Sequence, residues 1–139
     1  MTVRSAHASE LPVAAGGTPD DPAEMRAVRH HLGIRAFGIN LFEAPRAGDE
    51  VIETHVETQD SPSRHEELYL VLDGAATFEV DGEAVEAPAG TFVFVPDPAS
   101  RRGAVAREDA TRVLAVGAPR GEGFRVSAWE REHFPGEDA

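Results

Sequence analysis

The sequence predicts an all-β fold, either a barrel or a two-sheet jelly roll, from two observations. Between residues 34 and 119, apolar and polar residues alternate with the period of two that is typical of strands with one buried face. The alternating segments are short, and turn-forming pairs such as Asp73-Gly74 and Asp81-Gly82 separate them. Many short strands at regular spacing, with almost no helix, are typical of sandwiches and barrels.

The 139 residues are predicted to form a single domain. Residues 34–119 form the barrel in this interpretation, and residues 120–139 form a tail that packs on it. Residues 1–33 are predicted to be a loose N-terminal arm, because their mixture of Ala, Ser, Gly and Pro buries little apolar surface. Within the arm, Asp20 and Pro22 favour a short helix that runs to about His30 and ends near Gly33.

The first two predicted strands differ in their chemistry. Residues 34–42 alternate with Phe37, Ile39 and Leu41 on one face. Residues 50–57 alternate as well, which places His55 and Glu57 on the same side. The turn-forming residues from 58 to 63 predict a loop after this strand.

The next predicted strand, residues 64–72, has one polar face and one apolar face. Three leucines at positions 68, 70 and 72 lie on the apolar face, which we expect to be buried against a second sheet or another subunit. Residues 92–95 are apolar on both faces and predict a strand in the barrel interior. The polar face of 64–72 is defined by alternate residues: His65, Glu67, Tyr69 and Val71.

The composition excludes several classes of function. A formal net charge of -12 would repel a phosphate backbone, so we expect no nucleic-acid partner. The chain has no cysteine, so His, Asp or Glu must bind any metal. No apolar run approaches the ~20 residues of a membrane helix, and the first residues have no apolar core of signal-peptide length. A cytoplasmic protein without membrane contact is expected.

The middle of the chain resembles the two sequence motifs of the cupin family. The resemblance spans residues 48–101, and further segments look like those of small bacterial cupin-domain proteins of unassigned activity. It implies a cupin barrel, or double-stranded β-helix, and no particular substrate. The residues that carry it are Gly48, His55, Glu67, Gly74, Pro88-Ala89-Gly90 and Pro96.

The resemblance also implies where a metal site would lie. Cupin sites take two His and a Glu from the first motif and one His from the second. Here His55 falls at the first His and Glu67 at the Glu, whereas Glu57 stands at the second His. Arg101, five residues after Pro96, falls at the last His. Arginine has no lone pair for a metal and would repel a divalent ion, so the usual set is incomplete.

Two interpretations of these residues follow. In the first, a rebuilt site of His55, Glu57, His65 and Glu67 holds iron, manganese, nickel or zinc, since imidazole and carboxylates together suit these ions. In the second, Arg101 forms a buried ion pair with Glu67 or Glu57 in place of the metal.

Three functions are consistent with these alternatives. The first is a barrel that binds a small, anionic molecule, with Arg101 as the clamp and with Tyr69 and Glu67 lining the cavity. The second is a metal-dependent cupin enzyme of oxygenase or isomerase type. The third is a non-catalytic interaction module with a filled cavity. A homodimer is expected in addition, because the leucine face and the first strand supply more apolar area than a lone small barrel needs.

Overall fold

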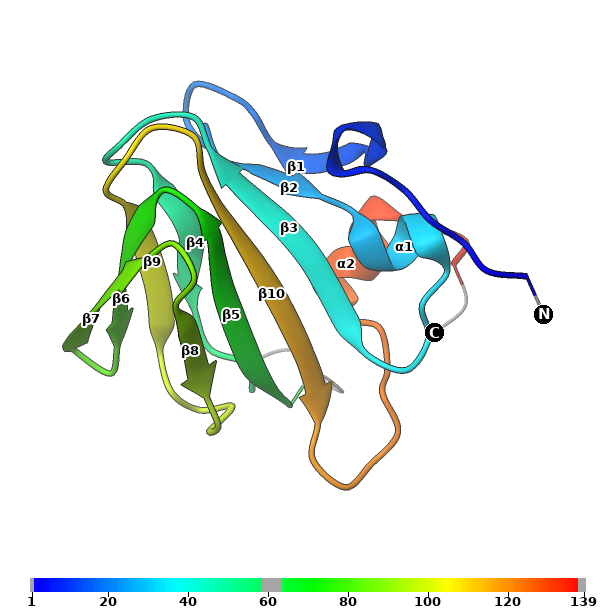
Figure 1. Ribbon diagram of the computed structural model, residues 1–139. Coiled ribbons are helices and arrows are strands. Elements are labelled where there is room, and N and C mark those ends of the chain that lie inside the picture. The colour runs from blue at the N-terminus through cyan, green and yellow to red at the C-terminus, as the bar shows by residue number, and fades with distance from the viewer. Residues whose placement is uncertain (1, 59–63, 138–139) are drawn as a thin grey trace.

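Two antiparallel sheets packed face to face form the body of the protein (Figure 1). The computed structural model describes residues 2–58 and 64–137. One sheet has the strand order β1-β2-β3-β10-β5-β8 and the other β4-β9-β6-β7, which confirms the predicted all-β, two-sheet fold. The strands are β1 (Val13–Gly16), β2 (Glu24–Arg26), β3 (Gly38–Ala44), β4 (Glu50–His55), β5 (His65–Asp73), β6 (Ala75–Val80), β7 (Glu83–Pro88), β8 (Phe92–Val95), β9 (Arg102–Ala106) and β10 (Thr111–Pro119).

The predicted turn pairs join consecutive strands. Asp81 and Gly82 both have positive φ, 50° and 82°, and connect β6 to β7 in a two-residue hairpin in which Val80 pairs with Glu83. Gly74, with φ 74°, connects β5 to β6, and a Cβ there would lie 2.4 Å from Thr111 Oγ1. Both turns therefore require the residues that the sequence supplies.

The N-terminal region differs from the sequence prediction. Residues 24–26 form β2, which pairs with both β1 and β3, so residues 13–16 and 24–26 extend the first sheet instead of forming a loose arm. A 3-10 turn, η1 (Ala8–Glu10), precedes them, and the helix α1 (Val28–Leu32) begins eight residues after Asp20. Pairing with the open edge of β3 overrides the local helix preference. The helix ends at Gly33, φ 72°, as predicted.

The C-terminal region packs against the N-terminal helix. Its helix α2 (Ala128–His133) carries Glu130, which is buried and accepts a hydrogen bond from the buried Arg29 of α1 at 2.8 Å. His30 of α1 stacks on Phe134, with ring centroids 3.8 Å apart. A buried ion pair and a ring stack therefore join segments about a hundred residues apart in the sequence. No helix in the described part of the chain is long and apolar enough to cross a membrane.

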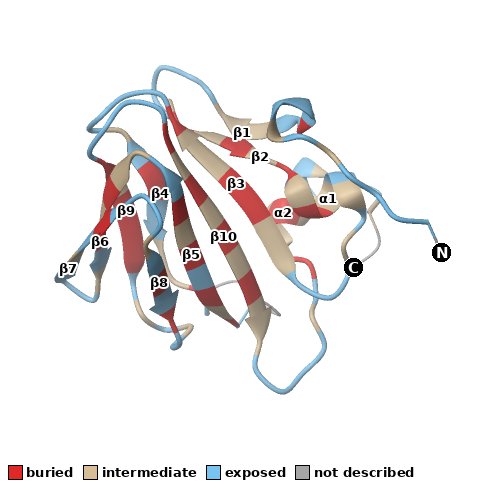
Figure 2. Ribbon diagram, in the orientation of Figure 1, coloured by how far each residue is buried: buried red, intermediate tan, exposed pale blue. Residues whose placement is uncertain are grey.

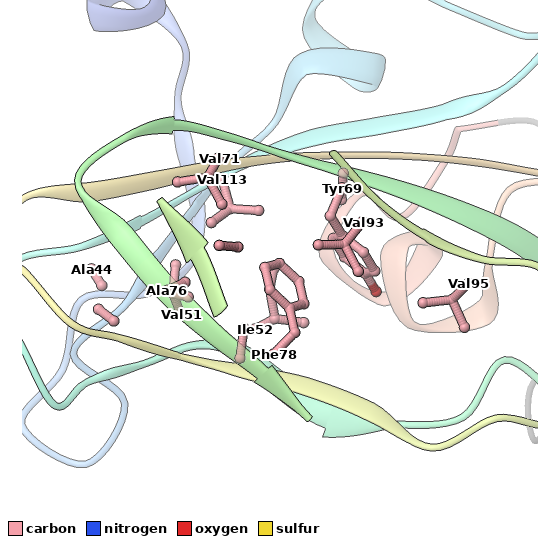
Figure 3. Packing of buried hydrophobic residues seen from close by; sticks show 14 residues of the cluster. Ala44, Val51, Ile52, Tyr69, Val71, Ala76, Phe78, Val93, Val95 and Val113 are labelled. Atoms are coloured by element: carbon pink, nitrogen blue, oxygen red, sulfur yellow. The ribbon is translucent and has the colours of Figure 1, made fainter. Parts of the chain in front are cut away.

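The apolar core lies between the two sheets (Figure 3). Val71 of β5, Phe78 of β6 and Val113 of β10 have no exposed surface, and their side chains converge there. Buried and more exposed residues alternate along β5 (Figure 2). The buried residues are His65, Glu67, Tyr69 and Val71, so the inward face is the more polar of the two.

Of the two alternatives predicted for the leucine face, burial against a second sheet is wrong, and burial against another subunit stays a prediction. Leu68 and Leu72 lie on the outer face of β5 and are exposed. Phe92 and Phe94 of β8 are exposed as well, although a strand with two apolar faces was predicted for the interior. Period-two alternation separates the two faces of a strand, but it does not identify the inward one when both carry large apolar residues.

Candidate functional site

An irregularity in β4 turns His55 into the barrel. Ile52 pairs with Ala104 and His55 pairs with Arg102, so three residues on β4 advance against two on β9. Such a β-bulge re-aims side chains relative to strict alternation. Gly103 makes room for it, because a Cβ there would lie 2.5 Å from Thr54 Oγ1 and 3.1 Å from Thr54 Cα.

Glu67 enters the same space from β5. It pairs with Gly117 of β10, where a Cβ would lie 3.2 Å from Glu67 Cγ and 3.3 Å from His65 Cβ. The inward residues of β10 decrease in size from Val113 through Ala115 to Gly117, which leaves room for the carboxylate at this end of the barrel. The Tyr69 hydroxyl donates to Glu67 Oε1 at 2.6 Å.

The buried arginine of the site is Arg102, and not Arg101. Arg101, directly before β9, is exposed; its backbone N–H donates to the Asp81 carboxylate and its carbonyl accepts from the Asp81 N–H, in the hairpin between β6 and β7. Arg102 has no exposed surface, and its Nη1 lies 3.2 Å from Glu67 Oε1 and 4.0 Å from Glu57 Oε1. Its Nη2 donates to the Asp97 carbonyl at 3.0 Å.

Counting residues from Pro96 therefore misplaced this arginine by one position. The sequence contains a signal for the correct register: Ala104 and Ala106 are inward-facing residues of β9, and the alternation that puts them inside also puts Arg102 inside. Small residues at 104 and 106 face Phe78 and Ala76 of β6 across the sheet pairing.

Three side chains that could bind a metal converge at one end of the barrel interior, which we call the mouth. His55 Nε2 lies 3.2 Å from Glu57 Oε1 and 3.5 Å from Glu67 Oε1. One ligand atom from each of these three residues lies within 4.8 Å of the others. The other ring nitrogen, His55 Nδ1, donates to the Glu53 carbonyl at 2.6 Å, which orients the ring with Nε2 toward the carboxylates.

The fourth residue predicted for a rebuilt site, His65, is not part of this group. Its ring stacks on Phe124 with centroids 5.3 Å apart, and its buried Nε2 has no hydrogen-bond partner among the described residues. Burial lowers the pKa of His65, although Glu67 opposes the shift. The predicted loop at 58–63 lies, apart from Thr58, outside the described residues.

The charges at the mouth compensate one another. Burial lowers the pKa of His55, but hydrogen bonds to Glu57, Glu67 and the Glu53 carbonyl outweigh it and raise the pKa to about 10. In the absence of a metal, His55 is therefore a cation at neutral pH and, with Arg102, faces the two glutamates.

The two glutamates have opposite pKa shifts. Burial, reinforced by the charge of Glu67, raises the pKa of Glu57 above its usual value despite His55. Burial also acts to raise the pKa of Glu67, but hydrogen bonds from His55, Glu57 and Tyr69 outweigh it and lower the pKa. Glu67 is thus the better stabilised carboxylate of the pair. Burial and the Glu67 charge raise the pKa of Tyr69 well above 10, so its hydroxyl stays a donor.

The donor set fits a divalent transition metal. One imidazole and two carboxylates suit iron, manganese, nickel and zinc, and His55, Glu57 and Glu67 can hold such an ion. Arg102, whose Nη1 lies 4.0 Å from Glu57 Oε1, adds a positive charge that offsets the negative charge of Glu57.

A hollow of about 340 Å³ lies outside this group and contains none of the three donors. Two of its residues are linked to residues already described, because Arg120 donates to Glu66 and Asp97 accepts from Arg102. Its lining residues are Arg64, Glu66, Pro96, Asp97, Pro98 and Arg120.

Comparison with known proteins identifies the fold. No family model matches the sequence, and no curated protein matches it significantly. Among solved structures, an RmlC-like cupin from Shewanella frigidimarina is 19% identical, with a TM-score of 0.61 over 86% of this chain and 95% of its own. A predicted oxalate decarboxylase from Thermotoga maritima is 21% identical, with a TM-score of 0.62 over 84% and 97%. KdgF from Halomonas sp. is 22% identical, with a TM-score of 0.57 over 72% and 81%.

Proposed function

We propose that this chain, whose fold is that of the cupin structures it resembles, binds a divalent transition metal at the barrel mouth and, through that centre, a small anionic molecule. The observation that carries the proposal is the convergence of His55 Nε2, Glu57 and Glu67 within 4.8 Å of one another. The anchoring of His55 Nδ1 by the Glu53 carbonyl supports it, because metal-binding imidazoles are usually oriented in this way.

The charge of the centre supports an anionic ligand. A divalent ion, two ionised glutamates, a neutral His55 and Arg102 together leave one excess positive charge. The Thermotoga maritima protein is named for oxalate, a small dicarboxylate, which agrees with this class of ligand. Arg102 itself is fully buried, so its role in the proposal is to set the charge of the site and to position Glu67.

A bound metal ion would act as a Lewis acid toward the ligand. Arg102 and Tyr69 hold the Glu67 carboxylate by donating to Oε1 at 3.2 and 2.6 Å. His55, whose side chain is 36% exposed against 11% for Glu57 and for Glu67, is the donor that an entering ligand would meet first.

A second candidate is a metal-free barrel that binds a neutral polar molecule. The observation that favours it is that Glu67 Oε1 already accepts from Tyr69 and Arg102, with His55 nearby, so the site is charge-balanced without an ion. In that case the charged groups at the mouth form a hydrogen-bonded polar network, and an anionic ligand is not expected.

Calorimetric titration separates the two candidates. Protein purified without a histidine tag and stripped with a chelator should bind one Mn²⁺, Fe²⁺, Ni²⁺ or Zn²⁺ ion per chain. Glu67→Gln should weaken binding by at least about 100-fold, because it removes a charged ligand. Glu66→Gln is the matched control, since it makes the same change one residue away on the outer face of β5.

A second titration, with oxalate as the probe, tests the binding of an anionic ligand. It should bind to the metal-loaded protein and not to the stripped protein. Absence of stoichiometric metal binding by the unmodified protein would exclude the proposal and favour the metal-free candidate.

A further inference from the structure

His65 is buried at the mouth with one ring nitrogen that has no partner. Its side chain faces inward on β5, two residues from Glu67, and the residue is 5% exposed. In the described part of the chain, His65 Nε2 neither donates nor accepts a hydrogen bond. A buried polar group of this kind is rare in folded proteins, because it has lost its contact with water and gained nothing in return. The nitrogen is therefore a candidate contact for a bound molecule.

Phe124 covers this histidine. The two rings stack with centroids 5.3 Å apart and an angle of 29° between their planes. Phe124 also lies over Gly38 of β3, where a Cβ would be 3.4 Å from Phe124 Cε1. Gly38 pairs with Gly117, and Gly117 pairs with Glu67. The Phe124 ring therefore lies at the end of a row of inward residues that leads across the sheet to a proposed metal ligand.

The segment that carries Phe124 is weakly held where it leaves the sheet. It joins β10 to α2 as a loop at one end of the first sheet (Figure 1). Residues 123–126 make no backbone-to-backbone hydrogen bond within the described residues. Gly121 has φ 70°, and a Cβ at Gly121 or Gly123 would meet no atom within 4 Å beyond the neighbouring residues. Backbone with so few contacts opens at little cost, so the loop allows Phe124 to move away from His65.

The other end of the segment is fixed. Val126 and Ser127 are buried. Three residues further on, Glu130 accepts a hydrogen bond from the buried Arg29 at 2.8 Å. Motion is thus confined to the residues before Val126, and a displacement of Phe124 leaves the packing of α2 intact.

We propose that Phe124 is a movable cover of the mouth, and that its displacement lets His65 Nε2 hydrogen-bond to the anionic molecule bound at the metal centre. This inference rests on the proposed function, which supplies the metal and the anion. An oxygen atom of the anion is the partner that Nε2 lacks, with Nε2–H as the donor. His65 is then a ligand-binding residue and not a metal ligand, in agreement with its place outside the group of His55, Glu57 and Glu67.

Titration of the metal-loaded protein with oxalate tests the contact. His65→Phe keeps a ring against Phe124 and removes the nitrogen, so the oxalate dissociation constant should rise about 10-fold. The metal affinity should stay the same. His30→Phe is the matched control, because His30 also stacks on a phenylalanine, Phe134, but in the contact between α1 and α2. It should bind oxalate as tightly as the unmodified protein does.

Carbethoxylation by diethyl pyrocarbonate tests the cover without any metal. The reagent modifies accessible imidazole nitrogens, and mass spectrometry of the peptide that contains His65 measures the rate. Phe124→Ala should accelerate this reaction at least about 10-fold, because the rate follows the population of the open form. Phe134→Ala is the control and should leave the rate at His65 unchanged. Phe124→Ala should also tighten oxalate binding to the metal-loaded protein, because no closed form competes with the ligand.

The outcomes separate this inference from the proposed function. If the unmodified protein bound neither metal nor oxalate, the proposed function would fail, and the contact with His65 would fail with it. If the unmodified protein bound both and His65→Phe bound oxalate equally well, only the contact with His65 would be overturned. Equal rates of carbethoxylation at His65 in the unmodified protein and in Phe124→Ala would overturn the cover.

Discussion

The two ends of the barrel interior are built on the same strands with opposite chemistry. At the closed end, Val71 of β5 and Val113 of β10 pack with Phe78 of β6, and none of the three is exposed. At the mouth the inward residues are Glu67, four residues before Val71 on β5, and Arg102, two residues before Ala104 on β9. The closed end is held by apolar area and the mouth by hydrogen bonds between charged groups.

Tyr69 lies at the boundary between the two ends. Its ring packs against Phe78, with centroids 5.3 Å apart, and its hydroxyl donates to Glu67. A mouth filled with apolar residues would be at least as stable, since buried ion pairs rarely repay the cost of desolvating their charges. The comparison therefore indicates that stability comes from the closed end, and that the polar mouth serves binding.

The largest expected effect lies at the closed end. Phe78→Ala should lower the free energy of unfolding by about 3–5 kcal/mol, because it leaves a cavity among fully buried side chains. Metal affinity per folded molecule should not change. Denaturant unfolding with a chelator present measures the first quantity, and titration at low temperature the second. A large loss of metal affinity would contradict the separation of the two ends.

The second prediction alters the charge of the mouth. Arg102→His removes a cation next to the donors and adds an imidazole, so metal binding should tighten by about 100-fold, or about 2.7 kcal/mol. Oxalate binding to the metal-loaded protein should weaken, because the excess positive charge is lost. Arg101→His is the control, and both affinities should be unaltered because Arg101 is exposed. Equal effects of the two substitutions would refute the assignment of Arg102.

The third prediction concerns the boundary. Tyr69→Phe keeps the ring against Phe78 and removes the hydrogen bond to Glu67, so the free energy of unfolding should fall by about 1.5 kcal/mol. The pKa of Glu67 should rise, since the hydroxyl is one of the donors that lower it. Carboxyl NMR titration of the metal-free protein measures that rise. An unchanged pKa would mean that Arg102 and His55 alone hold the carboxylate.

The last prediction is a pH dependence that belongs to the mouth. The pKa of His55 is raised to about 10 in the folded protein, above its value of about 6.5 in an unfolded chain. Stability from this group is therefore fully present below about pH 6.5 and is lost as the pH rises toward 10. The melting temperature, measured as a function of pH with a chelator present, should fall over this range in the unmodified protein and not in His55→Gln. The exposed His31→Gln variant should behave like the unmodified protein.

Local chemistry in the sequence was enough to predict the fold. The turn pairs at 73–74 and 81–82 and the period-two alternation act over a few residues, and the structure confirms the hairpin and the two sheets. The resemblance to the cupin motifs placed His55, Glu57 and Glu67 in one predicted site, and their side chains do lie close together in the structure. These are properties of short segments, which can be recognised without knowing the rest of the fold.

Sheet pairing decided what the sequence left ambiguous. β2 is a strand because the edge of β3 is available to it, and the bulge that turns His55 inward exists because β4 must match β9. Arg102 is the buried arginine because β9 pairs with β4 and β6 in one register, and adjacent residues on a strand point to opposite faces. The same rule placed Leu68 and Phe94 outside. Which face of an alternating strand is inward depends on its partners, so only the tertiary structure could decide it.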